Sequence, residues 1–114
     1  MNKIEQDNLL FLADKYQNIC MSIDGFTSLL AMYGSAFTNQ IEPITEPTLL
    51  RSGNYATLFQ AKIWVAKHIS SGMISVSNEN IVNSNDEHLW SPQVPLELAS
   101  SDHIERLANL KALW

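Results

Sequence analysis

Side chains that could bond DNA bases or phosphates gather between residues 35 and 67. Asn39 and Gln40 carry amides that can bond adenine in the major groove in a bidentate manner. Arg51 has the charge to reach a phosphate or the minor groove from a neighbouring turn. The candidate DNA contacts are Ser35, Thr38, Asn39, Gln40, Arg51, Asn54, Lys62 and Lys67.

Each of these candidates also has a purely structural interpretation. Asn39 and Gln40 equally suit the solvated end of a helix, and Lys62 and Lys67 suit exposed positions that need no ligand. Residue type alone leaves both interpretations open.

Catalytic and metal-binding patterns are weak. Asp86, Glu87 and His88 are consecutive, but they lack a second histidine at ligand spacing. Cys20 is the single cysteine, which excludes an internal disulfide and a cysteine-based zinc site. Neither a phosphate-binding glycine loop nor a nucleophile motif is present. We therefore expect a protein that is not an enzyme and that uses no cofactor or metal.

The composition indicates a folded, acidic chain. It has 114 residues, 46% of them hydrophobic, and a net charge of −5. The acidity is concentrated in residues 73–114, where six acidic residues meet two basic ones, whereas residues 21–72 are neutral. Residues 1–20 lack a signal-peptide pattern, and no apolar run has the length of a membrane span. We expect a cytoplasmic protein.

The elements that must position these side chains follow from apolar spacing. Residues 4–19 and 23–31 predict helices, a turn near residue 33 leads to a second short helix ending near 40, and prolines then enforce extended chain. Predictions further along are a strand over 48–50, a turn at 51–54, a strand over 55–59, a helix over 60–70, a β-prone stretch at 73–77, a polar loop over 77–87, extended chain at 90–96 and an amphipathic helix over 102–113.

The block from residue 23 to residue 69 resembles the winged helix-turn-helix domain of the MerR and excisionase class. The matching motifs are IDGFTSLLAMYGSAFTNQI, Pro47, TLLRSGNYATLF and AKIWVAKHI. With the preceding NLLFLADKY, the layout is also similar to the pyocin activator family. The chain differs from this class in carrying Ala31 at the usual glycine of the turn and no arginine or lysine on the second helix.

This resemblance implies a mainly α fold with a small β-hairpin. It implies a winged helix-turn-helix domain over residues 1–72, followed by an acidic linker and a C-terminal helix over 73–114 that dimerises the chain or binds another protein. The candidate partner contacts are Trp90, Leu107, Leu110 and Trp114. Trp64 is expected in the core, whereas Trp90 and Trp114 suit either an interface or the cover of the core.

Two functions remain open at this level. The first is a small DNA-binding transcription regulator, or recombination accessory factor, of phage or mobile-element type, whose partner is double-stranded DNA. The second is an acidic protein-binding module, such as an inhibitor, immunity protein or adaptor, that uses the same fold without binding DNA. The first is the leading hypothesis and the second is its alternative, for which the acidic tail and the neutral central block speak.

Overall fold

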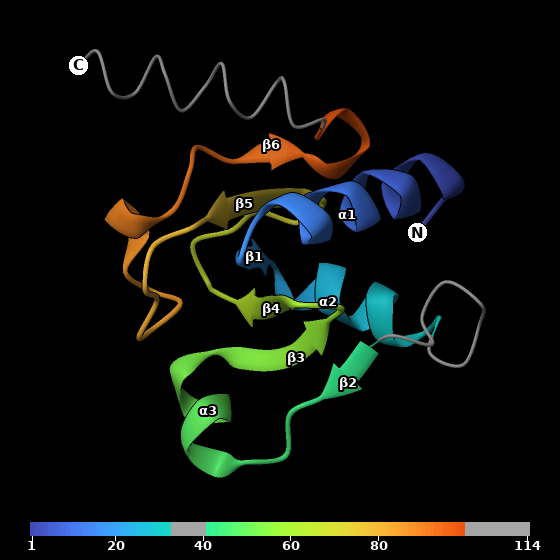
Figure 1. Cartoon of the computed structure of the whole chain (residues 1–114). Helices are drawn as coiled ribbons and strands as arrows, with labels where there is room; N and C mark the ends of the chain where they lie inside the picture. The colour runs from blue at the N-terminus through green and yellow to red at the C-terminus, as the bar shows by residue number, and fades with distance from the viewer. Residues whose placement is uncertain (33–40, 100–114) are drawn as a thin grey trace.

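A six-stranded mixed sheet organises the chain (Figure 1). The computed structural model describes residues 1–32 and 41–99. In chain order the elements are α1 (Lys3–Lys15), β1 (Asn18–Met21), α2 (Ile23–Leu30), β2 (Ile41–Pro43), α3 (Pro47–Ser52), β3 (Asn54–Leu58), β4 (Ala61–Val65), β5 (Met73–Ser77), the 3-10 turn η1 (Glu87–Leu89), β6 (Val94–Pro95) and the 3-10 turn η2 (Leu96–Leu98). The strand order is β2-β3-β4-β1-β5-β6, with β1 parallel to β4 and the other pairs antiparallel.

The mainly α winged-helix fold predicted from the sequence is therefore wrong. The segment AKIWV, predicted as part of a helix, forms β4, with Ala61 and Ile63 buried and Lys62 exposed. This segment contains β-branched and aromatic residues, and it forms a strand because it pairs with β1 on one side and with β3 on the other. The spacing of apolar residues within one segment does not reveal that pairing, because the partner strands lie elsewhere in the sequence.

The first predicted helix is correct in kind but too long. Asn2 caps α1 through a capping box with Glu5, and the helix ends at Lys15. Residues 18–21 continue the apolar spacing, yet they form β1, which is buried along its whole length between β4 and β5. A strand covered on both faces reads as a continuous apolar run, which sequence alone cannot separate from a helix end.

The turn predicted at residues 51–54 ends a helix instead of joining two strands. Pro47 opens α3, whose first-turn amides donate to the Glu46 carboxylate. Gly53 ends α3 in the left-handed region at φ 98°. The strand predicted over 48–50 is thus wrong, and the hairpin joining β3 to β4 turns at Phe59 and Gln60.

Other local predictions are confirmed. The helix predicted from residue 23 is α2, capped by Ser22, whose Oγ accepts the Gly25 amide. Residues 54–58 and 73–77 form β3 and β5 as expected. The second helix of the predicted helix-turn-helix and the helix predicted over 102–113 lie mostly or wholly outside the described residues.

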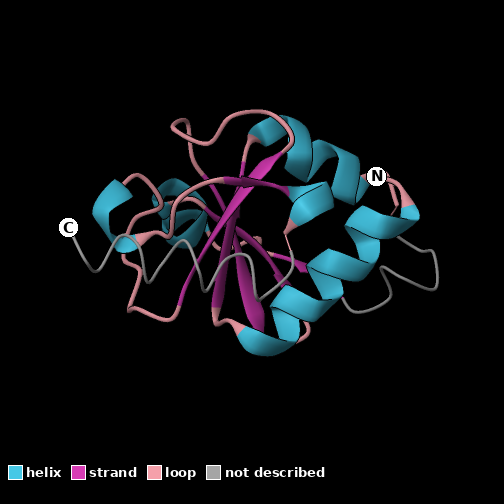
Figure 2. Ribbon diagram, turned by 90° about the horizontal axis from the view of Figure 1, so that it is seen from above, coloured by secondary structure: helices cyan, strands magenta, loops and turns pink. Residues whose placement is uncertain are grey.

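Two clusters of buried side chains fill the two faces of the sheet. The larger joins α1 and α2 to the strands, with Leu9, Leu12 and Leu29 at its centre. The smaller gathers around Trp64 and Trp90, under the loop that leads to β6. Figure 2 shows the longer helices on one side of the strands, and loops with short helical turns on the other.

The sheet extends across the boundary predicted at residue 72. β5 pairs with the central β1, and β6 pairs with β5, so residues 73–99 share one sheet with the first 72 residues. Both edge strands are short and contain a proline, Pro43 in β2 and Pro95 in β6. Proline has no backbone N–H group to donate to a further strand, so both edges of the sheet disfavour the addition of another strand. Among the described residues, no helix has the length and apolarity to cross a bilayer.

Candidate binding surfaces

A cleft lies beyond the carboxyl ends of the parallel strands β1 and β4. Its volume is about 490 Å³. The start of α2, the end of α3 and the chain that leaves β4 contribute to its walls. In open α/β sheets, ligands bind outside the carboxyl ends of parallel strands, which makes this cleft the first candidate site.

Hydrogen bonds around Gly53 hold the cleft together. The Val65 amide donates to the Gly53 carbonyl at 2.8 Å, and the Ser84 amide donates to the Ser52 carbonyl at 2.9 Å. The Ser84 hydroxyl donates to the Val65 carbonyl at 2.6 Å and is buried. The end of α3, the end of β4 and the loop around residue 84 are thereby joined, so the cleft is built on fixed backbone.

Two of the sequence candidates, Arg51 and Lys67, line this one cleft. Both side chains are exposed, and the exposed Asp24 lines the cleft with them. Two basic groups thus face one acidic group, in a chain whose net charge is −5. The N-terminal end of α2 adds the partial positive charge of the helix dipole.

A second surface lies along the outer side of α1, which carries apolar side chains on both of its faces. Leu9 and Leu12 are buried, whereas Ile4 is 62% exposed and Phe11 is 54% exposed. Because Ile4 and Phe11 are seven residues apart, they lie in one line along the helix.

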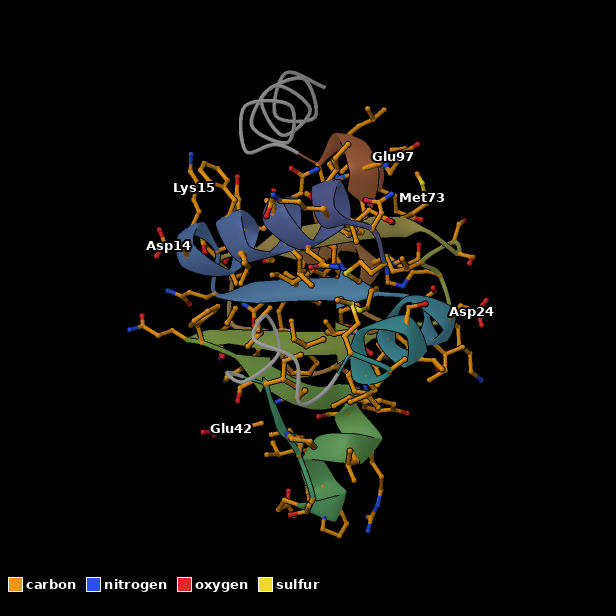
Figure 3. All side chains as sticks on the ribbon, turned by 90° about the vertical axis from the view of Figure 1, so that its right-hand side faces the viewer. Asp14, Lys15, Asp24, Glu42, Met73 and Glu97 are labelled. Atoms are coloured by element: carbon orange, nitrogen blue, oxygen red, sulfur yellow. The ribbon has the colours of Figure 1, made fainter. Side chains whose placement is uncertain are left out.

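The 3-10 turn η2 extends this surface. The Asn8 side chain lies one turn from Ile4 and from Phe11, and it donates to the carbonyls of Leu96 at 2.9 Å and Glu97 at 3.1 Å. Leu98, 58% exposed, belongs to the same turn. Ile4, Phe11 and Leu98, with the nearby acidic residues Asp7, Asp14 and Glu97, form what we call the α1 face. Figure 3 shows Asp14 at the end of α1 and Glu97 on η2.

The turn between β3 and β4 presents a further aromatic side chain. Phe59 has φ 54° and is 51% exposed. A bulky residue at positive φ is strained, and the first position of such a hairpin turn normally takes glycine. With Gln60 and the α1 residues Leu10, Ala13 and Asp14, Phe59 lines a hollow of about 420 Å³.

Trp90, a candidate partner contact, is 2% exposed. Its ring lies edge-to-face against Trp64, with the ring centroids 6.4 Å apart. Its Nε1 donates to the Ser84 carbonyl at 2.9 Å, and the Trp64 Nε1 donates to the Asn18 side chain at 3.0 Å. This placement favours the alternative in which Trp90 covers the core.

The other sequence candidates are dispersed. Asn54 is buried at the start of β3, so it is not available to a ligand. Lys62 lies exposed on β4 and does not line the cleft. The candidates outside the described residues are Ser35, Thr38, Asn39, Gln40, Leu107, Leu110 and Trp114.

Sequence reasoning missed Asp24, Ser84 and Phe59. In the sequence, Asp24 lies at the start of the helix predicted over 23–31, Ser84 in the polar loop predicted over 77–87, and Phe59 at the end of the strand predicted over 55–59. The roles of these three residues come from contacts between distant segments. A local signal marks only Phe59, because an aromatic residue is unusual in a two-residue turn.

Glu87, His88 and Cys20 are side chains with potential chemistry that the sequence singled out. Glu87 and His88 lie exposed in η1, and no group of three metal-binding side chains occurs among residues 1–32 and 41–99. Burial raises the pKa of the Cys20 thiol from 9.0 to about 12, so this cysteine is neutral and unreactive near pH 7.

No protein-family model, curated protein or solved structure matches this chain. Any functional conclusion therefore rests on these two surfaces.

Proposed function

We propose that this protein is an acidic protein-binding module that docks on a basic partner through the α1 face. The main support is the exposure of Ile4, Phe11 and Leu98 on one side of the molecule. Contiguous exposed apolar side chains bordered by polar ones are typical of protein-interaction sites. Aromatic residues such as Phe11 are enriched at interfaces.

The charge of the molecule suits a basic partner. Twelve acidic residues against seven basic ones give a negative field that speeds encounter with a positive surface. Asp7 and Asp14 on α1 and Glu97 on η2 are exposed and can pair with lysine or arginine at the rim of an interface. The basic residues Lys3 and Lys15 also lie on α1, so these five side chains carry a net charge of −1. Burial of the apolar side chains would supply the affinity. The acidic residues at the rim would set the orientation of the partner.

The mode of docking follows from the edges of the sheet. Because Pro43 and Pro95 blunt β2 and β6, we expect side-chain contacts on α1 and η2 rather than strand addition. We place this binding in the cytoplasm, because the chain's single cysteine has no disulfide partner within it.

DNA binding stays a prediction. The helix predicted to contact DNA bases lies outside the described residues. The winged-helix fold that would have presented that helix is not the observed fold.

The test compares proteins retained from the source cell's extract by three immobilised chains. We expect the wild-type chain to retain a basic protein that the Phe11→Ser chain does not. Val82→Ser is the matched control, because Val82 is 71% exposed and lies in the loop after β5, outside α1 and η2. Thermal unfolding of all three chains checks that each is folded.

The retained protein is then purified and titrated into each chain by calorimetry. We expect Phe11→Ser to weaken binding by about 2 kcal/mol, as for an interface aromatic residue, and Val82→Ser to leave it unchanged. Equal binding by wild type and Phe11→Ser would refute the α1 face. Retention of DNA alone by all three chains would favour the nucleic-acid function instead.

A further inference from the structure

We propose that the cleft beyond β1 and β4 binds a small molecule through a phosphate monoester group. This site is separate from the α1 face and independent of the protein-binding function. None of the residues that line the cleft belongs to the α1 face.

The charges around the cleft select an oxyanion. Arg51 and Lys67 supply two positive charges on its walls, and a phosphate monoester carries between one and two negative charges near pH 7. Arginine offers planar paired donors that match phosphate oxygens, while lysine contributes a point charge. Asp24 on the same walls offsets one of these two charges, so the cleft keeps a net positive charge of one, which favours a ligand with an anionic group.

The surrounding backbone strengthens the same preference. The N-terminal end of α2 reaches the cleft at Ile23 and Asp24, so its dipole favours a negative ligand. The opposing carbonyls at the end of α3 are already engaged, since Leu50 accepts from the Gly53 amide and Ser52 accepts from the Ser84 amide. The C-terminal end of α3 therefore has few free carbonyl oxygens that would repel a phosphate.

The size and remaining lining indicate an organic group beside the phosphate. A volume of about 490 Å³ exceeds what a free phosphate ion needs and lies within the range of small-ligand pockets. Tyr55, Val65 and Ile69 provide apolar surface for that group. Asp24 can accept a hydroxyl or amino hydrogen, and it would repel a second anionic group.

The test is an NMR titration of the backbone amides with sodium phosphate and, separately, with phenyl phosphate. Sodium chloride at matched ionic strength serves as the reference. We expect saturable shifts at Asp24, Gly53, Lys67 and Ser84, and tighter binding of phenyl phosphate, because its ring can contact the apolar walls.

The variants use the chain's own lysines as controls. Arg51→Gln and Lys67→Gln should each weaken binding about tenfold, as expected for the loss of one charge-assisted contact. Lys62→Gln removes the same charge outside the cleft and should leave binding unchanged. Phe11→Ser should also leave it unchanged, which separates this site from the protein-binding proposal.

Shifts that rise linearly without saturation, or that fall equally in Lys62→Gln, would overturn the proposal. Saturable shifts at the same amides with a short DNA duplex, but not with phenyl phosphate, would also overturn it and would assign the cleft to nucleic acid.

Discussion

Replacing Gly53 with alanine tests how the cleft is built. Gly53 lies at φ 98°, where an L-residue is strained, and it packs against the loop around Ser84. An added Cβ would overlap the Ser84 hydroxyl and lie 2.7 Å from the Ser84 Cβ and 2.9 Å from the Val65 carbonyl oxygen. The Ser84 hydroxyl donates to that same carbonyl, so the neighbour cannot rotate away without losing a buried hydrogen bond.

The expected cost has two separable parts. Holding alanine in the left-handed region costs about 1–2 kcal/mol. Overpacking against Ser84 and Val65 costs about 1–3 kcal/mol more. The sum, roughly 2–5 kcal/mol, is a large fraction of the 5–15 kcal/mol that stabilises a typical domain. Gly53→Ala should therefore fold but unfold at markedly lower denaturant concentration.

Gly72 supplies the matched control. It also has positive φ, at 78°, but an added Cβ would meet no atom within 4 Å. Gly72→Ala should thus cost only the backbone part, about 1–2 kcal/mol. Urea unfolding followed by the fluorescence of the buried Trp64 and Trp90 measures both variants.

A double-mutant cycle with Ser84→Gly isolates the part of the packing cost that comes from the Ser84 side chain. In that background Gly53→Ala should cost less than in the wild type, but still more than Gly72→Ala, because the added Cβ keeps its contact with the Val65 carbonyl oxygen at 2.9 Å. If Gly53→Ala costs no more than Gly72→Ala in the wild-type background, the close approach of α3 to the loop around residue 84 is refuted.

The remaining predictions concern the hairpin turn, the core and α3. At Phe59, glycine should be more stable than alanine by about 1–2 kcal/mol because φ is positive, as urea unfolding of the two variants will show, and equal stabilities would contradict the strained turn. Because burial raises the pKa of Cys20 from 9.0 to about 12, the unfolded thiol ionises first, so stability should fall as pH rises through this range, by up to about 1.4 kcal/mol per pH unit. The difference between wild type and Cys20→Ala isolates this slope, and parallel curves would disprove it. The amides of Thr48 and Leu49 hold the pKa of the exposed Glu46 below its usual value, so its carboxyl should titrate by NMR at lower pH than in an unfolded peptide; an ordinary titration would exclude this cap. Trp90→Phe leaves the Ser84 carbonyl without its indole donor and should cost about 1–3 kcal/mol in urea unfolding, with an unchanged midpoint as the contrary result.

The sequence by itself determined those elements whose signals are local. α1 and α2 follow from apolar spacing together with the caps Asn2 and Ser22, because helix hydrogen bonds join residues close in the chain. β3 and β5 follow from β-prone residues between turn signals. The acidic charge is also a property of composition alone.

Only the tertiary structure decided the sheet and the two binding surfaces. β1 and β4 are short apolar segments, compatible with helix or strand, and their parallel pairing over Asn18–Met21 fixes both as strands. That pairing brings Arg51, Lys67 and Asp24 to one cleft, and the hydrogen bonds from Asn8 hold η2, which contains Leu98, against α1. Contacts between distant segments carry no local period, so the fold-level resemblance to a winged helix failed, and the helix predicted over 60–70 contains β4, while α1 and α2 were predicted from local signals.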